Sequence, residues 1–127
     1  DRALIEFNRA LALKPTSTEV LSSRGLTRML ADDPDGAEAD LRLALALQPQ
    51  HVDALVNLGN LYAARKDYQP AAELYRQALD IAPRDVEVRF NLALALYMMG
   101  MSEAAGRVLR EDRRAVAMWI GQGGPPV

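Results

Sequence analysis

The chain has 127 residues, 50% of them hydrophobic, and its formal net charge is −2. It contains no cysteine, which excludes disulfide bonds and thiolate metal sites. Acidic and basic residues are interspersed, and no apolar run approaches the roughly 20 residues that cross a bilayer. The sequence therefore favours neither nucleic acid binding nor membrane insertion, and its length is sufficient to bury a core.

The dominant pattern is a repeat every 34 residues, because the same kinds of residue return at that spacing. A period of this length is typical of helical units that stack side by side. Each repeated proline follows an apolar run and ends the helix that this run is expected to form. The columns of small, bulky and proline residues are Ala10, Ala44 and Ala78; Ala37, Ala71 and Ala105; Phe7, Leu41, Tyr75 and Leu109; and Pro15, Pro49 and Pro83.

Apolar residues at a spacing of about 3.6 predict a series of helices in chain order. Asp33 and Asp85 are N-cap signals, and Ser102 marks the start of another helix. Gly100 is a stop signal. The expected helices cover about 2–13, 18–31, 35–47, 52–65, 68–81, 86–99 and 103–112.

The C-terminal part of the sequence predicts a cap followed by a tail. Residues 113–120 form a final turn or short helix, in which we expect Trp119 and Ile120 to cover the last repeat. The composition of residues 121–127, rich in glycine and proline, is typical of a flexible tail.

The best copy of the repeat, residues 52–85, resembles the tetratricopeptide repeat (TPR) family. Residues 18–51 and 86–119 are similar with fewer matches, and residues 1–17 look like the second helix of a further unit. The resemblance implies an all-α fold, a right-handed α-solenoid of antiparallel helix pairs over residues 1–120. The matching residues of the best copy are Leu55, Leu58, Gly59, Tyr62, Ala71, Tyr75, Ala78 and Pro83.

Two arginines depart from the family pattern, which prefers apolar side chains at the positions of Arg24 and Arg28. They lie one helical turn apart on an otherwise apolar helix. Two explanations remain open. The arginines could pair with an acidic residue, for which the candidates are Glu6, Glu38 and Asp40, or they could contact a helix upstream of the chain.

Catalysis and metal binding find little support in the sequence. His51 is the only histidine and falls in a turn, whereas a metal site or an activated nucleophile needs several groups within reach. The run from Asp33 to Gly36 lacks the outer ligands of a calcium loop and is better explained as a helix start. We therefore expect no enzyme activity, no metal and no cofactor.

In the family that the chain resembles, the first helix of each unit lines a concave groove. The matching columns place a polar row there, whose amides can pair with the backbone of a bound peptide. Apolar columns beside this row would anchor the ligand. The predicted groove residues are Ser23, Asn57, Asn60, Asn91, Leu26, Met29, Val56, Phe90, Leu94 and Tyr97.

A third row is acidic and consists of Glu19, Asp53 and Glu87, again 34 residues apart. These carboxylates could select a basic segment of a partner. All three also fall in the first turn of an expected helix, where a negative charge complements the helix dipole. Both explanations remain open.

The resemblance implies a non-enzymatic scaffold for protein–protein interaction that binds an extended peptide or an amphipathic helix in its groove. A regulatory arm of a larger enzyme and a self-assembling homo-oligomeric module remain alternatives. The chain lacks an initial methionine and begins within a repeat, so we expect it to be a piece of a longer protein. The stretch Val88 to Leu96 is similar to the closing repeat of bacterial pilus-assembly lipoproteins and to polysaccharide-export scaffolds. That similarity implies envelope assembly and favours a periplasmic location, and a cytoplasmic location remains the alternative.

Overall fold

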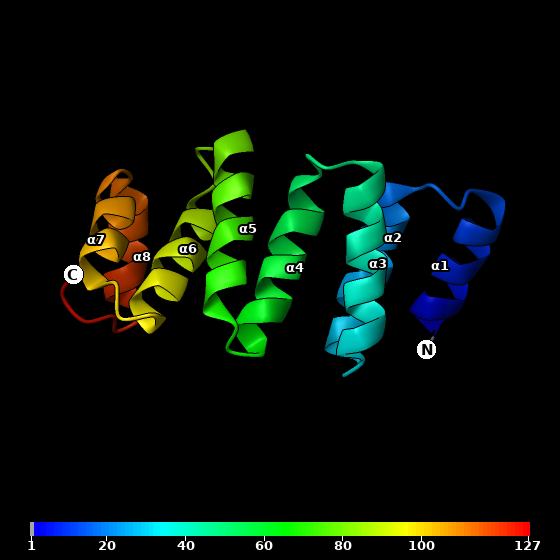
Figure 1. Ribbon diagram of the computed structural model, residues 1–127, viewed down its shortest axis with the longest axis horizontal. Coiled ribbons are helices and arrows are strands. Elements are labelled where there is room, and N and C mark those ends of the chain that lie inside the picture. The colour runs from blue at the N-terminus through cyan, green and yellow to red at the C-terminus, as the bar shows by residue number, and fades with distance from the viewer. Residues whose placement is uncertain (1) are drawn as a thin grey trace. The chain divides into compact units, whose positions relative to one another are not determined.

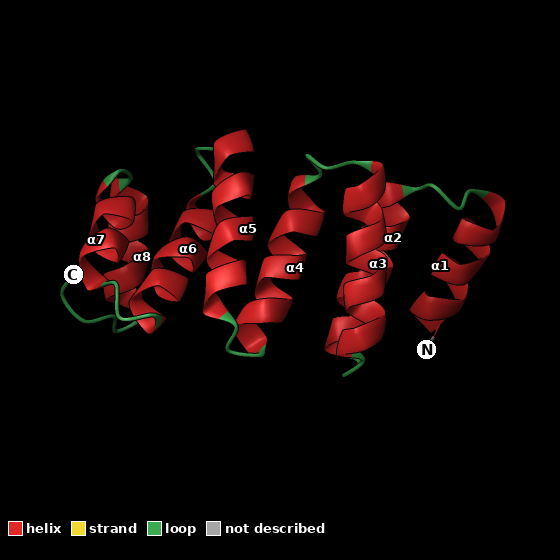
Figure 2. Cartoon of the chain, viewed as in Figure 1, coloured by secondary structure: helices red, strands yellow, loops and turns green. Residues whose placement is uncertain are grey.

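A computed structural model describes residues 2–127, which form eight α-helices and contain no strand (Figures 1 and 2). The expected helices and the all-α class are confirmed, with small shifts at the helix ends. The predicted final turn or short helix is a helix. In chain order the helices are α1 (Arg2–Leu13), α2 (Thr18–Leu30), α3 (Pro34–Leu47), α4 (Val52–Ala64), α5 (Tyr68–Ile81), α6 (Val86–Met98), α7 (Ser102–Arg110) and α8 (Arg113–Gly121).

The chain divides into two compact units. The first ends at Leu61 and contains α1, α2, α3 and most of α4, whereas the second comprises Tyr62–Val127 and contains α5 to α8. In the first unit, α2 packs against both α1 and α3, and these three helices alternate in direction (Figure 1). In the second unit, α6 packs against α5, α7 and α8, and α7 also packs against α8. Within each unit, helices that follow one another in sequence thus pack together as the repeat predicts.

Alanine and leucine dominate both cores, and the repeated small residues lie where helices approach closely. A Cβ atom added at Gly25 of α2 would lie 2.9 Å from Cγ of Leu41 of α3, so this glycine allows the contact. Helix α1 differs, because none of its residues is buried. Buried core residues of the first unit include Leu21, Ala37, Leu41, Ala44, Leu55, Leu58 and Leu61. Those of the second unit include Ala71, Tyr75, Ala78, Val88, Leu92, Leu96, Ala105, Leu109 and Trp119.

Two predicted N-caps are present. The side chain of Asp33 accepts a hydrogen bond from the backbone N–H of Gly36 at 3.0 Å, and Pro34 is the first residue of α3. The side chain of Asp85 accepts hydrogen bonds from the backbone of Glu87 and of Val88, which opens α6. Each carboxylate satisfies N–H groups that have no partner within their own helix.

The predicted start of α7 differs in detail. Ser102 is the first residue of the helix, whereas the N-cap position belongs to Met101, whose side chain makes no capping hydrogen bond. The reason lies in the preceding turn, where Gly100 has φ +80° and the N–H of Met101 bonds to the carbonyl of Leu96. Closing α6 in this way places the serine one residue too late to cap α7.

The turn within each helix pair contains a left-handed residue at a fixed position of the repeat. Asp32 has φ 62°, Lys66 has φ 65° and Gly100 has φ 80°. At the second of these turns, the N–H of Lys66 bonds to the carbonyl of Ala63 and the N–H of Asp67 to that of Tyr62. This pair of bonds closes a helix with a residue at positive φ, for which glycine is the preferred residue.

Replacing Lys66 with glycine should stabilise the protein by about 0.5–1 kcal/mol. A left-handed conformation costs a residue with a Cβ atom roughly 1–2 kcal/mol, and the greater chain entropy of glycine in the unfolded state offsets part of that gain. Urea unfolding followed by circular dichroism measures the change. Lys66→Ala removes the charge but keeps the Cβ atom, so it should leave the stability near that of the unmodified chain. Equal effects of both substitutions would contradict this explanation.

The two unusual arginines of α2 bind a buried carboxylate of α3, Asp40, which is one of the acids that the sequence offers as partners. Arg24 donates to Asp40 from Nε at 2.8 Å and from Nη2 at 2.6 Å, and Arg28 donates to Asp40 at 3.0 Å. Arg24 also donates to Oδ1 of Asn8 in α1 at 2.9 Å. The hydrogen bond with Asp40 raises the pKa of Arg24 although burial opposes the rise. This polar cluster joins three helices of the first unit.

A buried arginine has a comparable role in the second unit. Arg89 of α6 donates to the carbonyl of Val108 at 3.2 Å and to a carboxylate oxygen of Glu111 at 2.9 Å. It also donates to the carbonyl of Pro83 at 2.9 Å. Arg89 thereby ties α6 to the end of α7 and to the turn before α6, a role that the sequence analysis missed.

Candidate functional site

The predicted groove residues lie on the first helix of each pair, namely α2, α4 and α6, and we call their outward surfaces the first-helix faces. On α2, Ser23 and Leu26 are exposed and Met29 is half-buried. On α4, the half-buried side chains are Val56, Asn57 and Asn60. On α6, Leu94 is exposed, whereas the half-buried side chains are Phe90, Asn91 and Tyr97. None of the ten residues is fully buried.

Two exposed apolar columns recur on the first-helix faces. Leu26 of α2 and Leu94 of α6 occupy the same position of the repeat and are 36% and 41% exposed. One turn later, Leu30 and Met98 are 79% and 51% exposed. Leu30 and Met98 belong to a further column of the repeat, with Ala64 between them, which the sequence also places beside the polar row of the predicted groove. Each of the two units therefore presents an apolar pair at the same position.

Asn57 makes a contact within the first unit. Its Nδ2 atom donates to Oγ of Ser22, which is buried in α2, at 3.4 Å. The bond links α4 to α2 and orients the amide of Asn57. An asparagine amide carries two donor hydrogens and an acceptor oxygen, so one internal bond does not use its whole capacity.

Two of the predicted apolar anchors contact the chain's own C-terminal helix. The ring centroids of Phe90 and Trp119 are 5.8 Å apart, and those of Tyr97 and Trp119 are 5.5 Å apart with an edge-on arrangement. Trp119 is only 4% exposed and caps the second unit as the sequence predicts. The expectation for Ile120 is wrong, since it is 67% exposed. Part of the surface expected to anchor a partner is therefore covered by α8.

The start of α8 is fixed by a short-range charge pair. Asp112 accepts a hydrogen bond from the backbone N–H of Arg114 at 2.9 Å and another from its guanidinium at 2.7 Å. The side-chain bond from Arg114 is the main cause that lowers the pKa of Asp112 to about 2. Arg114 also donates to the carbonyl of Arg84 at 2.9 Å. These bonds hold the helix that carries Trp119.

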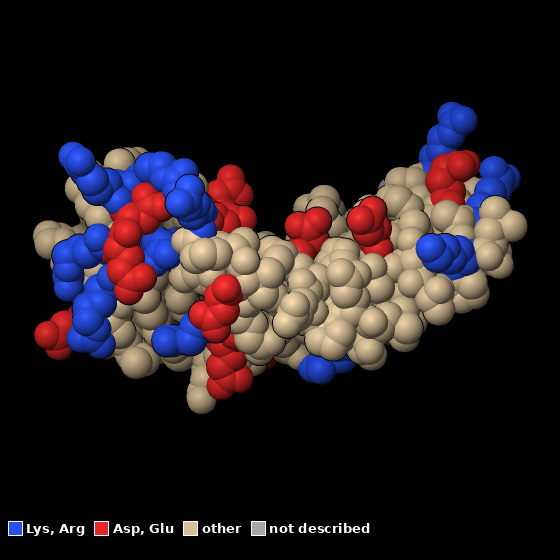
Figure 3. Space-filling view, turned by 90° about the horizontal axis from the view of Figure 1, so that it is seen from above, with Lys and Arg blue, Asp and Glu red and all other residues tan. Residues whose placement is uncertain are grey.

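The acidic row lies at the starts of the first helices. Glu19, Asp53 and Glu87 are in the first turns of α2, α4 and α6, and all three are exposed. This position suits a favourable interaction with the helix dipole. Selection of a basic ligand by the row stays a prediction. In the second unit, α7 and α8 carry Arg107, Arg110, Arg113 and Arg114 but one acid, Glu103, and basic side chains cover much of the visible surface with acidic ones among them (Figure 3).

The lone histidine has a local structural role. Nδ1 of His51 accepts a hydrogen bond from the backbone N–H of Ala54 at 3.1 Å, which satisfies the start of α4. Within residues 2–127, no three side chains of histidine, cysteine, aspartate or glutamate are grouped so that they could hold a metal ion. In the same part of the chain, every helix is too short or too polar to cross a membrane.

Comparison with known proteins relates this arrangement to a repeat family. A family profile for the TPR repeat matches residues 59–100. No curated protein sequence matches the chain.

Solved structures share the fold at low sequence identity. A crystal structure of MamA protein is 21% identical, with a TM-score of 0.80 over 98% of this chain and 68% of that one. A second MamA structure is 20% identical, with a TM-score of 0.77 over 84% of this chain and 63% of its own. YrrB, described as a TPR protein with an unusual peptide-binding site, is 20% identical with a TM-score of 0.79. It is matched over 87% of this chain but only 56% of its own length. The chain therefore matches the TPR repeat profile over residues 59–100 and has the helical fold of these solved structures.

Proposed function

We propose that the chain is a non-enzymatic scaffold that binds a segment of a partner protein on its first-helix faces. The observation that supports this proposal is the repetition of exposed apolar residues at one position of the repeat. Leu26 and Leu94 are 36% and 41% exposed although neighbouring apolar positions of the same helices are buried. Single exposed leucines are common on protein surfaces, but the same exposed pair in two repeats indicates a function of the face.

The spacing of these residues suits an elongated ligand. Leu26 and Leu30 lie one turn apart on α2, as Leu94 and Met98 do on α6, so each pair forms a short apolar strip along its helix. A strip of this kind can accept the apolar side chains of an amphipathic helix or alternate side chains of an extended peptide. Methionine also adapts its shape to different ligand side chains.

The amides beside these strips would orient the ligand. Asn57, Asn60 and Asn91 are half-buried on α4 and α6, and each amide can donate to a carbonyl and accept from an N–H group. Such bonds do not depend on the side chains of the ligand, so they suit a scaffold that reads the peptide backbone. The peptide-binding site named for YrrB supports this assignment by analogy of fold.

Panning the immobilised chain against a random peptide display library tests the proposal. The affinity of the enriched peptides is then measured by fluorescence anisotropy on variants of the full chain. Leu94→Glu should weaken binding at least about tenfold, because it places a charge on an apolar contact worth more than about 1.4 kcal/mol. Leu26→Glu should lower the affinity of those enriched peptides that contact the face of α2.

Leu43→Glu provides the matched control, because Leu43 is 46% exposed but lies on α3, a second helix. It should leave the affinity within about twofold of the unmodified chain. Circular dichroism of each variant checks that its helicity is unchanged. Peptides whose affinity falls with Leu43→Glu and not with Leu94→Glu would move the site to the opposite faces and contradict the proposal.

A further inference from the structure

The tail after α8 turns back onto the helices instead of extending away. Gly123 has φ 77°, its N–H bonds to the carbonyl of Ile120, and the N–H of Gly124 bonds to the carbonyl of Trp119. This pair of bonds is the usual closure of a helix by a left-handed glycine. It directs the next residue toward α8, where the indole Nε1 of Trp119 donates to the carbonyl of Pro125 at 2.7 Å.

Glycines on both sides of the contact allow the tail to approach closely. A Cβ atom added at Gly124 would lie 2.4 Å from Nε1 of Trp119. On the opposite side, a Cβ atom added at Gly106 of α7 would lie 2.9 Å from the carbonyl carbon of Val127. Arg110 of α7 donates to the carbonyl oxygen of Val127 at 3.3 Å. The helices thus hold the tail by its backbone carbonyls, at points where no side chain intervenes.

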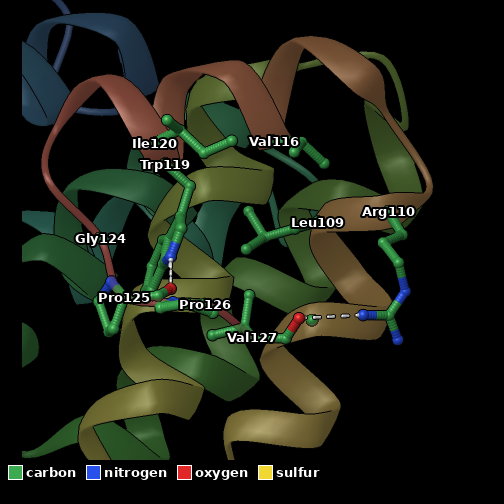
Figure 4. Close-up of a pocket in the computed structure, with 10 residues that line it drawn as sticks. Leu109, Arg110, Val116, Trp119, Ile120, Gly124, Pro125, Pro126 and Val127 are labelled. Carbon is green, nitrogen blue, oxygen red and sulfur yellow. Dashed lines mark hydrogen bonds between the residues drawn. The ribbon is translucent and has the colours of Figure 1, made fainter.

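The tail leaves a pocket of about 460 Å³ against the helices. Figure 4 shows the side chains of Leu109, Val116 and Ile120 on one side of it and the tail on the other. Ile120, which does not cover the last repeat, lines this pocket instead. The side chains that the tail offers there are two prolines and a valine, and they leave apolar lining exposed. The pocket can therefore accept a larger apolar side chain than the tail supplies.

We propose that this surface, the tail site formed by Gly106, Leu109, Arg110, Val116, Trp119 and Ile120, binds an extended proline-containing segment of a partner protein. The tail occupies the site as an intramolecular ligand and so shows which chemistry fits it. Proline favours the polyproline II conformation, whose carbonyls have no internal hydrogen bonds and can accept from an indole N–H or a guanidinium. Recognition of such segments by aromatic grooves follows the same logic.

The unfilled pocket explains how a partner can replace the tail. A tethered tail has an effective concentration on the order of millimolar, so an identical free peptide competes poorly. A partner segment with a bulky apolar side chain after its prolines would fill the pocket in addition to making the carbonyl contacts. The tail site lies on α7 and α8, and although Trp119 packs on Phe90 and Tyr97 of α6, the pocket is lined by none of the exposed residues Leu26, Leu30, Leu94 and Met98. Its use by a partner therefore does not depend on the function proposed for the first-helix faces.

Opening the site in the full chain tests the inference. Gly124→Ala brings a Cβ atom against Trp119, whose ring cannot yield because Phe90 and Tyr97 pack on it. The tail must move away, and acrylamide quenching of this single tryptophan should rise. The variant should also bind a labelled Gly-Gly-Pro-Pro-Leu peptide amide at least about tenfold more tightly than the unmodified chain, because the competing tail is displaced.

Gly121→Ala is the matched control, since among residues 2–127 a Cβ atom there would meet nothing within 4 Å beyond its chain neighbours and the nearby backbone of its own helix. It should behave like the unmodified chain. In the Gly124→Ala background, Trp119→Phe keeps an aromatic ring but removes the N–H donor. It should lower the affinity for the peptide about tenfold. A peptide with glycines in place of both prolines should also bind at least about tenfold more weakly.

Three results would overturn the inference. The first is that Gly124→Ala and Gly121→Ala bind the peptide with equal affinity. Quenching could rise in Gly124→Ala without any gain in peptide binding, in which case the tail contact is structural only. The peptide could also bind Gly124→Ala with the same affinity after Trp119→Phe, which would place its site elsewhere.

Discussion

Trp119→Ala is expected to lower the free energy of unfolding by about 3–5 kcal/mol, the usual cost of removing a large buried aromatic side chain. Trp119 is 4% exposed and holds α8 on the second unit through the rings of Phe90 and Tyr97. Tilted and edge-on ring pairs of this kind contribute beyond the area that they bury. The substitution also removes the N–H group that holds Pro125. Urea unfolding followed by far-UV circular dichroism measures the loss.

Two substitutions serve as controls for this prediction. Trp119→Phe keeps a ring between Phe90 and Tyr97 and should cost about 1–2 kcal/mol. Ile120→Ala changes the neighbouring residue, which is 67% exposed, and should stay within about 0.5 kcal/mol of the unmodified chain. A loss for Trp119→Ala no larger than that for Ile120→Ala would show that α8 does not unfold together with the second unit.

Asp40→Asn should lower the free energy of unfolding by about 2–4 kcal/mol. The carboxylate is 4% exposed and accepts hydrogen bonds from both Arg24 and Arg28. Asparagine keeps the shape but removes the negative charge that both arginines share, and Arg28 then retains only the carboxylate of Asp33 at 4.0 Å among its ion pairs in residues 2–127. Breaking a buried ion pair by removing one partner typically costs about 3–5 kcal/mol. The side chains of Arg24 and Arg28 remain 19% and 26% exposed, so water compensates part of that cost.

The control is an exposed ion pair in the same helix. Glu38 accepts from Arg42 at 2.9 Å, with side chains that are 24% and 60% exposed, and Glu38→Gln should cost no more than about 0.5 kcal/mol. Replacing Arg24, Arg28 and Asp40 together by methionine or leucine should recover stability, because well-packed apolar residues can replace a buried ion cluster. Equal losses for Asp40→Asn and Glu38→Gln would contradict the assigned role of the cluster.

The sequence predicted the helices well because the same signals return in every repeat. Asp33 and Asp85 cap helices through bonds of three residues or fewer, so local chemistry was enough to find them. Ser102 begins α7 as predicted but does not cap it, because the closure of α6 also uses Met101 and the two helix ends share the same short turn. Arg24 could not be assigned a partner from the sequence, since the choice among acids depends on how α2 packs against α3.

The candidate site was predicted less completely than the fold. The column of Leu26 and Leu94 followed from the repeat and both residues are exposed, whereas their role in binding stays a prediction. The covering of Phe90 and Tyr97 depends on where α8 docks, which lies outside the repeat pattern. The return of the tail depends on a single left-handed glycine, Gly123. From composition alone, a segment rich in glycine and proline is predicted to be flexible.

The lack of any buried residue in α1 has a consequence for local motion. Phe7 and Leu11 are half-buried, and the bond from Arg24 to Asn8 is partly open to water, so little free energy opposes the release of this helix. Its amide hydrogens should therefore exchange with solvent through openings confined to α1. Those around Leu92 and Leu96 of α6 should exchange only when the second unit unfolds as a whole.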